Sequence, residues 1–266
     1  MPLTEGVLPR AGFDLHYWTA GPPDAPLVVV THGATVDHHE WDTTLPLLAE
    51  RFRVLAWDVR GHGRSRPAGF DLRAAEQDLL DLLDSLGAGP AIFLGHSMGG
   101  NLHQELAFHH PARVRALACV DCAWNFQTLT PLEQWSLRNA GPIFKLYPHR
   151  LLLNQSVAAN TANPAGQALL RPAMESLTKV EFVQALLATA ACLHAEPGYV
   201  IGQPLLLIVG DQDRTGNIRQ SMPAWAAHEP DCRLVVIPNA RHAPHLDQPA
   251  AFHAALFAFL ARFQPA

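Results

Sequence analysis

Short apolar runs and amphipathic segments alternate along most of this chain. Mostly apolar runs, the pattern of strands buried on both faces of a sheet, occupy residues 27–31, 54–57, 91–94, 114–120, 205–209 and 234–237. Segments with helical spacing of apolar residues lie between several of these runs. Repeated units of strand and helix predict an α/β protein with a doubly wound, mostly parallel sheet and helices on both faces.

Helix and turn signals agree with this pattern. Asp71 can cap a leucine-rich helix, and Gly87 is placed to end it. A last helix with an apolar stripe begins near Pro249, a residue that is favoured in the first turn. Ahead of the first buried run, residues 3–7 and 13–20 predict a hairpin. The chain therefore starts with two paired strands before the parallel units begin.

The alternation stops in the middle of the chain. Residues 123–202 are interpreted as helical pieces broken by prolines, without a run of the buried-strand kind. Apolar side chains are too many in this segment for a solvated linker. We therefore expect one α/β core domain, made of residues 1–122 and 203–266, with residues 123–202 inserted as a helical cap, or lid.

Chemically useful side chains follow the ends of the predicted strands. Ligands of a parallel sheet bind beyond the carboxyl ends of its strands. The residues past these ends include one serine, several carboxylates and two histidines: His32, Asp58, Ser97, Asp211, Asp213 and His242. A serine hydroxyl is a poor nucleophile unless an imidazole takes its proton and a carboxylate orients that imidazole. The predicted edge offers all three groups.

Ser97 lies in the pentapeptide Gly95-His96-Ser97-Met98-Gly99, between a predicted strand and a predicted helix. A bare match of this kind arises by chance in roughly one chain in ten of this length. The context is more specific, because a sharp turn from strand to helix needs small residues on both sides of the serine. We therefore expect a nucleophile elbow that exposes Ser97 at the sheet edge.

Taken together, these motifs resemble the α/β-hydrolase fold superfamily, in the group of esterases, enol-lactonases, C–C bond hydrolases and cofactor-free perhydrolases. The similarity extends over nearly the whole chain. It rests on five segments in order: residues 32–33, 58–65, 95–100, 210–213 and 242–249. The order of serine, acid and histidine along the chain is also the order found in that superfamily.

The resemblance implies roles for the polar residues of the edge. Ser97 is the expected nucleophile and His242 its general base. By similarity the acid that orients His242 is Asp213, with Asp211 as the lesser candidate. Among the other histidines, His245 is the only rival to His242. Attack by Ser97 on a carbonyl would give an acyl-enzyme, which water then resolves.

An oxyanion hole follows from the same resemblance. The backbone N–H groups of Met98, at a helix start, and of Ala34, after the His32-Gly33 pair, are expected to bind the developing negative charge. Two positions depart from the pattern, because relatives often carry a bulky residue at Ala34 and a glycine at Arg241. The shape of the pocket and the backbone of the histidine loop are therefore left open.

The expected function is hydrolysis of a carboxylic ester, thioester or lactone of a small, largely apolar substrate. The same triad would also serve a C–C bond hydrolase, an enol-lactonase or a perhydrolase, and a small-molecule receptor could keep the fold with residual hydrolase activity. Three aromatic side chains of the cap are the expected substrate-binding residues: Trp124, Trp135 and Phe144. Arg138, Arg150 and Arg171 are expected on solvated faces, so neutral substrates are favoured over carboxylates.

Composition narrows the partners. The chain has 266 residues and a net charge of -5, with no basic run, so neither nucleic acid nor an anionic membrane surface is an expected partner. Residues 1–5 lack the pattern of a signal peptide, and no apolar run reaches membrane-spanning length, so a cytoplasmic protein is expected. The expected partner is a small-molecule substrate, and a homodimer is left open.

Histidines and cysteines do not form a recognisable metal or redox motif. The segment 37–39, Asp-His-His, lacks the further spaced ligands of a metal cluster. Cys119 and Cys122 form a C-x-x-C, but they lie in or just after an apolar strand, where free thiols are expected. We therefore expect neither a metal nor a cofactor.

Overall fold

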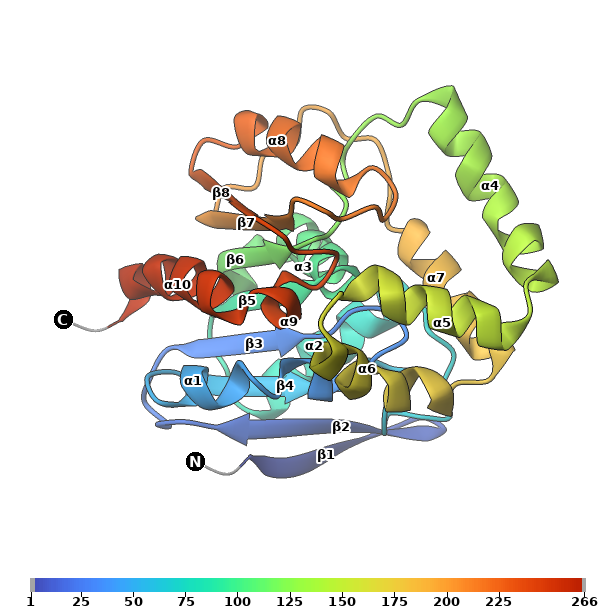
Figure 1. Cartoon of the computed structure of the whole chain (residues 1–266). Coiled ribbons are helices and arrows are strands. Elements are labelled where there is room, and N and C mark those ends of the chain that lie inside the picture. The colour runs from blue at the N-terminus through green and yellow to red at the C-terminus, as the bar shows by residue number, and fades with distance from the viewer. Residues whose placement is uncertain (1–2, 265–266) are drawn as a thin grey trace.

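The computed structural model describes residues 3–264. Residues 1–2, at the start of the N-terminal segment, and residues 265–266 lie outside the described part, and all four belong to the expected core domain. Eight strands form one sheet in the order β1-β2-β4-β3-β5-β6-β7-β8 (Figure 1). The strands are β1 Thr4–Arg10, β2 Phe13–Ala20, β3 Leu27–Thr31, β4 Arg53–Trp57, β5 Ala91–His96, β6 Val114–Val120, β7 Leu205–Gly210 and β8 Cys232–Ile237.

The pairing confirms the mostly parallel sheet. The predicted hairpin forms β1 and β2, which pair antiparallel, and β2 also pairs antiparallel with β4. All remaining neighbours, from β4 through β3 and β5 to β8, are parallel. Parallel strands need crossover connections, and the helices between them supply these.

Both faces of the parallel part of the sheet pack against helices, which explains why these strands are apolar without alternation. Along β3, Val29 faces a cluster that α2 (Leu72–Ser85), α3 (Met98–His109) and α8 (Ile218–His228) cover. Its neighbours Val28 and Val30 face the opposite cluster, under α1 (Leu45–Ala49) and α10 (Pro249–Leu260). The same alternation continues along the other parallel strands, so the predicted α/β architecture with helices on both faces is confirmed.

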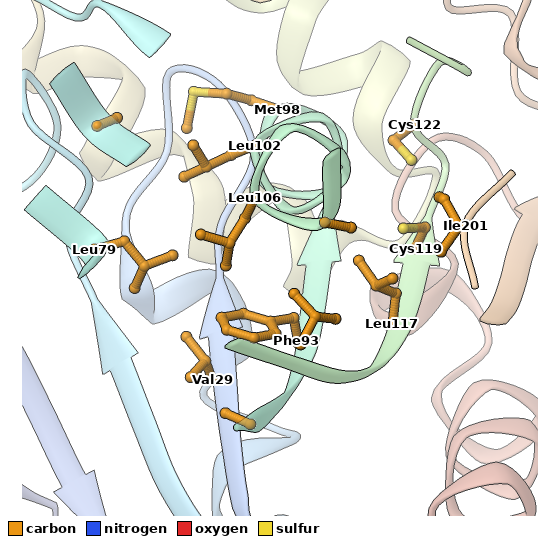
Figure 2. Close-up of a cluster of buried hydrophobic side chains, with 14 of the residues drawn as sticks. Val29, Leu79, Phe93, Met98, Leu102, Leu106, Leu117, Cys119, Cys122 and Ile201 are labelled. Atoms are coloured by element: carbon orange, nitrogen blue, oxygen red, sulfur yellow. The ribbon is translucent and has the colours of Figure 1, made fainter. Parts of the chain in front are cut away.

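Packing around α3 fixes the position of the residue that precedes it. Figure 2 shows Met98, Leu102 and Leu106 in a row along one side of this helix, with Leu79 of α2 and Phe93 of β5 close by. All five side chains are fully buried. Because the interior is close-packed, α3 cannot slide along the sheet without opening cavities. The turn between β5 and α3 is therefore held rigidly.

Four helices lie between β6 and β7: α4 (Pro131–Leu146), α5 (His149–Asn160), α6 (Pro164–Ser176) and α7 (Lys179–Ala190). We call these four helices the cap. Its own apolar cluster is shared by α5, α6 and α7 and reaches the core at Val36, Ala243 and Leu246. By contrast α4, all of whose residues are described, buries none of them completely. Figure 1 shows α4 standing away from the sheet.

Local signals of the sequence explain where the helices begin. Asp71 accepts a hydrogen bond from the N–H of Ala74, as the sequence predicts for a cap. Thr130 and Thr178 each form a reciprocal capping box with a glutamate three residues later. Shorter helical turns cover η1 His38–Trp41, η2 Pro111–Arg113, α9 Pro244–Asp247 and η3 Ala261–Phe263. Within residues 3–264, no helix is both long and apolar enough to span a membrane.

Candidate active site

The turn from β5 to α3 places Ser97 in a strained conformation. Its backbone has φ 48° and ψ -115°, a region that few side chains other than glycine occupy. A Cβ at Gly95 would come within 2.5 Å of the backbone of Gly99, and one at Gly99 within 2.5 Å of the carbonyl oxygen of Thr31. Glycine is therefore required at both positions. The turn is as tight as the sequence predicts.

Ser97 lies in one hydrogen-bonded chain with a histidine and an aspartate. His242 Nε2 is 3.0 Å from Ser97 Oγ, and His242 Nδ1 donates to Asp213 Oδ2 over 3.2 Å. The three residues come from three loops, which follow β5, β7 and β8. The second carboxylate oxygen of Asp213 accepts a hydrogen bond from the N–H of Thr215 at 2.8 Å. With its Nδ1 proton directed to Asp213, His242 can direct the lone pair of Nε2 to the hydroxyl of Ser97.

Electrostatics favour an ionised Asp213. Burial opposes ionisation, but the charge and the hydrogen bond of His242 outweigh it and lower the pKa of Asp213 to about 2. Asp211, the other candidate acid, accepts instead from the N–H of Ala240 at 3.3 Å. The structure thus brings Asp213, and not Asp211, to His242. The rival histidine, His245, lies 3.8 Å from Glu40 and stacks on Trp41.

A scan against family models matches residues 28–255 to the alpha/beta hydrolase family. The matched region holds every strand of the parallel part of the sheet except the first residue of β3. The chain belongs to the alpha/beta hydrolase family.

Known proteins agree with this assignment. The hydrolase is 30% identical over 252 residues to the protein named "Putative carbamate hydrolase RutD" of Pseudomonas savastanoi pv. phaseolicola, with 89% of this chain and 94% of that one covered. A solved hydrolase from Pseudomonas aeruginosa has TM-score 0.81 at 27% identity, covering 96% and 98% of the two chains. The enol-lactonase of Burkholderia xenovorans has TM-score 0.80 at 24% identity, covering 96% and 100%, which shows the shared fold.

The loop after β3 passes directly beside Ser97. A Cβ at Gly33 would lie 3.6 Å from the Cβ of Ser97 and 2.7 Å from His96 Nδ1, so only glycine fits there. Ala34, the next residue, follows directly on this close approach. Met98 begins α3, and the first N–H groups of a helix have no carbonyl partner within it. Gly33, next to Ala34 in the chain, and Met98 therefore both adjoin Ser97.

A second carboxylate, which the sequence reasoning missed, lies behind the aspartate and histidine pair. Asp121 follows β6, and its oxygens accept from the N–H of Gly210 at 3.1 and 3.2 Å. One oxygen of Asp121 lies within 4.8 Å of the polar atoms of Asp213 and His242. Complete burial, together with the charge of Asp213, raises the pKa of Asp121 well above its usual range. The sequence signal for Asp121 was its position directly after the predicted strand 114–120.

An open cavity of about 440 Å³ reaches Ser97 from the cap side. Other hollows of the surface are as large, but their linings do not include the serine. The walls are mainly apolar and come from α4, α7 and the segments beside them: Leu129, Leu132, Leu137, Leu186, Ala190 and Leu193. Among the described residues that line it, Glu133 carries the only charge.

The three aromatic residues expected to bind substrate are placed elsewhere. Trp124 packs on the core next to His228, with ring centroids 5.1 Å apart. Trp135 is 60% exposed, and Phe144 packs against the cap cluster. None of the three lines the cavity at Ser97. Helical periodicity explains the difference at α4, since Leu132 and Leu137 point to the cavity while Trp135 lies on another side.

Within the described residues 3–264, three clusters of acidic and histidine side chains are close enough to hold a metal ion: Asp37-His38-His39, Glu40-His96-His245 and Asp121-Asp213-His242. In each cluster one histidine already contacts a carboxylate of the protein. His38 Nδ1 donates to Asp58 at 2.8 Å, and His96 and His242 pair with Glu40 and Asp213. The cysteines are free thiols, and Cys119 and Cys122 are buried, as the sequence predicts.

Proposed function

We propose that the protein is a serine hydrolase that cleaves the carbonyl group of a small, neutral, largely apolar ester, thioester or lactone. The single observation that carries the proposal is the chain from Ser97 Oγ through His242 to Asp213, at 3.0 and 3.2 Å, at the foot of an apolar cavity. A serine in this setting can be deprotonated as it attacks.

In the proposed mechanism Ser97 Oγ attacks the carbonyl carbon while His242 Nε2 takes its proton. Asp213, ionised, holds the imidazole by its Nδ1–H and stabilises the cation that forms. The N–H groups of Ala34 and Met98 bind the oxyanion. His242 then donates its proton to the leaving alcohol or thiol. Water, deprotonated by His242, releases the acid from the acyl-enzyme.

Charge in the cavity supports neutral substrates. Both the hydroxyl and the N–H of Thr130 donate to Glu133 Oε2 at 2.7 Å, and these bonds hold the pKa of Glu133 below its usual range. Asn217 fixes the other oxygen at 2.6 Å. A substrate carboxylate would therefore meet a fixed negative charge. Arg138 and Arg150 are exposed, and Arg171 binds Asn154 and Glu175, so these arginines offer no compensation.

A matched pair of esters tests the substrate class. We expect kcat/KM to be higher for a neutral ester than for the same ester carrying a carboxylate. In Glu133→Gln this preference should shrink about three- to tenfold, as expected for loss of one charge near the surface. A preference of the wild type for the anionic ester, lost on neutralising Arg138, Arg150 or Arg171, would instead favour the enol-lactonase or C–C bond hydrolase alternatives.

Reaction with a fluorophosphonate tests the nucleophile itself. The reagent should label one residue per chain, and peptide mass spectrometry should place the label on Ser97. Steady turnover of an activated ester should disappear in step with labelling. Labelling elsewhere, or labelling without loss of turnover, would contradict the proposal. A single slow turnover with a large rise in Tm would favour the small-molecule receptor.

Carbamate hydrolysis is a second candidate, favoured by the relative named as a carbamate hydrolase that is matched over 94% of its length. A carbamate offers an acyl carbon to the same serine, but its nitrogen makes the carbonyl less reactive. Comparing an ester with a carbamate of equal size decides between them. Higher kcat/KM for the carbamate would make it the substrate class.

A further inference from the structure

A buried ion pair lies beneath the catalytic loops and plays no part in the mechanism above. Glu40, in η1, has a completely buried side chain, and its Oε1 lies 2.7 Å from His96 Nδ1. Its other oxygen, Oε2, accepts a hydrogen bond from the N–H of Gly33 at 2.8 Å. His96 is the last residue of β5 and directly precedes Ser97.

The bonds of His96 define its protonation. Nε2 lies 2.8 Å from the carbonyl oxygen of His242, and Nδ1 faces the carboxylate of Glu40. A carbonyl oxygen and an ionised carboxylate can only accept hydrogen bonds, so a proton on each ring nitrogen suits both contacts. These contacts fit His96 as an imidazolium ion paired with the carboxylate of Glu40. Together the two residues contact the loop of the expected oxyanion hole, the nucleophile elbow and the backbone of the catalytic histidine.

The surroundings are consistent with this charge state. Burial disfavours charge on both partners, but their mutual attraction outweighs it, so the pKa of Glu40 falls to about 2 and that of His96 is raised. The other titratable groups facing His96 are His245, His242 and Asp213. Burial lowers the pKa of His245 to about 3, so it is neutral.

We propose that Glu40 and His96 are positioning residues that hold the oxyanion loop, the nucleophile elbow and the catalytic histidine in register. The proposal rests on the proposed function, because it concerns the same site. A buried ion pair is weak evidence for stability, since desolvation cancels much of its attraction. This pair differs from a purely structural one because of where its contacts lead. Two hydrogen bonds reach the loop of Gly33 and the backbone of His242, and the ion pair itself includes His96 of the nucleophile elbow.

The consequence is a specific effect on turnover. Neither residue lines the cavity at Ser97, so substrate binding does not depend on them directly. A shift of the three segments relative to each other would instead raise the barrier of the chemical step. When His96 loses its proton at alkaline pH, it can no longer donate to both partners. The wild-type kcat should then fall on the alkaline side.

Glu40→Gln tests the inference, because the amide can still accept from Gly33 but carries no charge. We expect kcat for an activated ester to fall about 10- to 100-fold with KM changed less than threefold, and the alkaline decrease of kcat to disappear. Glu76→Gln is the matched control. Glu76 is a buried glutamate paired with His109 at 3.0 Å, between α2 and α3. This control should keep both the wild-type kcat and its pH profile.

Two further measurements separate the possible failures. The rate of fluorophosphonate labelling reports the reactivity of Ser97 without a natural substrate, and it should fall in Glu40→Gln as kcat does. An unlabelled wild type would overturn the proposed function, and the inference with it. A labelled wild type with equal labelling and an unchanged pH profile in Glu40→Gln would overturn the inference alone.

Nitrogen NMR of histidine-labelled wild-type protein covers the case in which Glu40→Gln does not fold. His96, identified by its absence in His96→Gln or by sequential assignment, should show two protonated ring nitrogens at neutral pH. Its deprotonation should track the alkaline decrease of kcat. A neutral His96 at pH 7 would contradict the inference.

Discussion

The sheet edge buries polar side chains, whereas the helix α4 of the cap exposes apolar ones. At the edge, the side chains of Asp213, His242 and Glu40 are buried, and each contacts two polar partners, at least one of them in another loop. In the cap, α4 leaves large apolar side chains in solvent, with Leu132 71% and Trp135 60% exposed. The candidate catalytic residues thus lie on a rigid part of the molecule, and one wall of the cavity is a loosely packed helix.

The physical reason lies in what each region packs against. The strands are buried on both faces, so their ends, and the loops that follow them, have few alternative positions. The helix α4 packs mainly on α7, and Glu133 joins it to the core through Asn217 at 2.6 Å. Elements with few buried contacts open at low free-energy cost. The comparison therefore predicts large effects on turnover from the edge and small effects on binding from the cap.

The largest effect is expected at Ser97. Ser97→Ala removes the proposed nucleophile and should lower the proposed ester hydrolysis by a factor on the order of 10⁴ or more. The fold should persist, because the change removes one hydroxyl at the foot of an open cavity. Steady-state kinetics and Tm measure the two quantities. Retention of more than a tenth of the wild-type kcat would refute the assigned nucleophile.

Two neighbouring carboxylates give the next test. Asp213→Asn should lower kcat by about 10²- to 10⁴-fold, because an amide at that site favours the wrong tautomer of His242. The same change at Asp121 should cost less than about threefold, since a carboxylic acid and an amide both accept from Gly210 and donate toward Asp213. Asp211→Asn should be as mild. If Asp211→Asn or Asp121→Asn is the inactive variant, the acid has been placed wrongly.

The ionised Asp213 also predicts a pH dependence of stability. Its pKa is about 2 in the folded protein, against an ordinary value of roughly 3.9. The contribution to the free energy of unfolding is present above the ordinary value and is lost as the pH falls through about 2. It amounts to up to ~2 kcal/mol. Urea unfolding between pH 5 and 2.5 should show a shallower loss for Asp213→Asn; equal slopes would contradict the ion pair.

The smallest effects on kinetics are expected from substitutions in α4, where the side that lines the cavity can be compared with the side that does not. Leu137→Ala should raise KM for an apolar ester about three- to tenfold, corresponding to ~1 kcal/mol of lost apolar contact, with kcat nearly unchanged. Trp135→Ala, on the side away from the cavity, should change KM less than twofold. Kinetics of both variants on one substrate decide the matter. A larger effect at Trp135 would restore it as a substrate-binding residue.

Several features of the site were readable from the sequence because they depend on local chemistry. The small residues around Ser97 reflect steric limits at one turn, whereas the preference for Asp213 over Asp211 came from the family resemblance. Asp121 obeys the same rule of lying past a strand, yet it was overlooked because its segment was interpreted through its cysteines. Glu40 carried no local signal, since its partners are 7 and 56 residues away along the chain.

The sequence by itself determined the α/β alternation, the inserted helical segment and the strand ends that carry serine, acid and histidine, because periodicity and turn chemistry act over a few residues. Only the tertiary structure decided which carboxylate faces His242, which charge states are stable, and which side of α4 meets the cavity. These properties depend on burial and on contacts between distant loops. Trp135 is an example. The sequence shows that it is apolar, but the packing of α4 determines that its side chain is exposed and does not line the cavity.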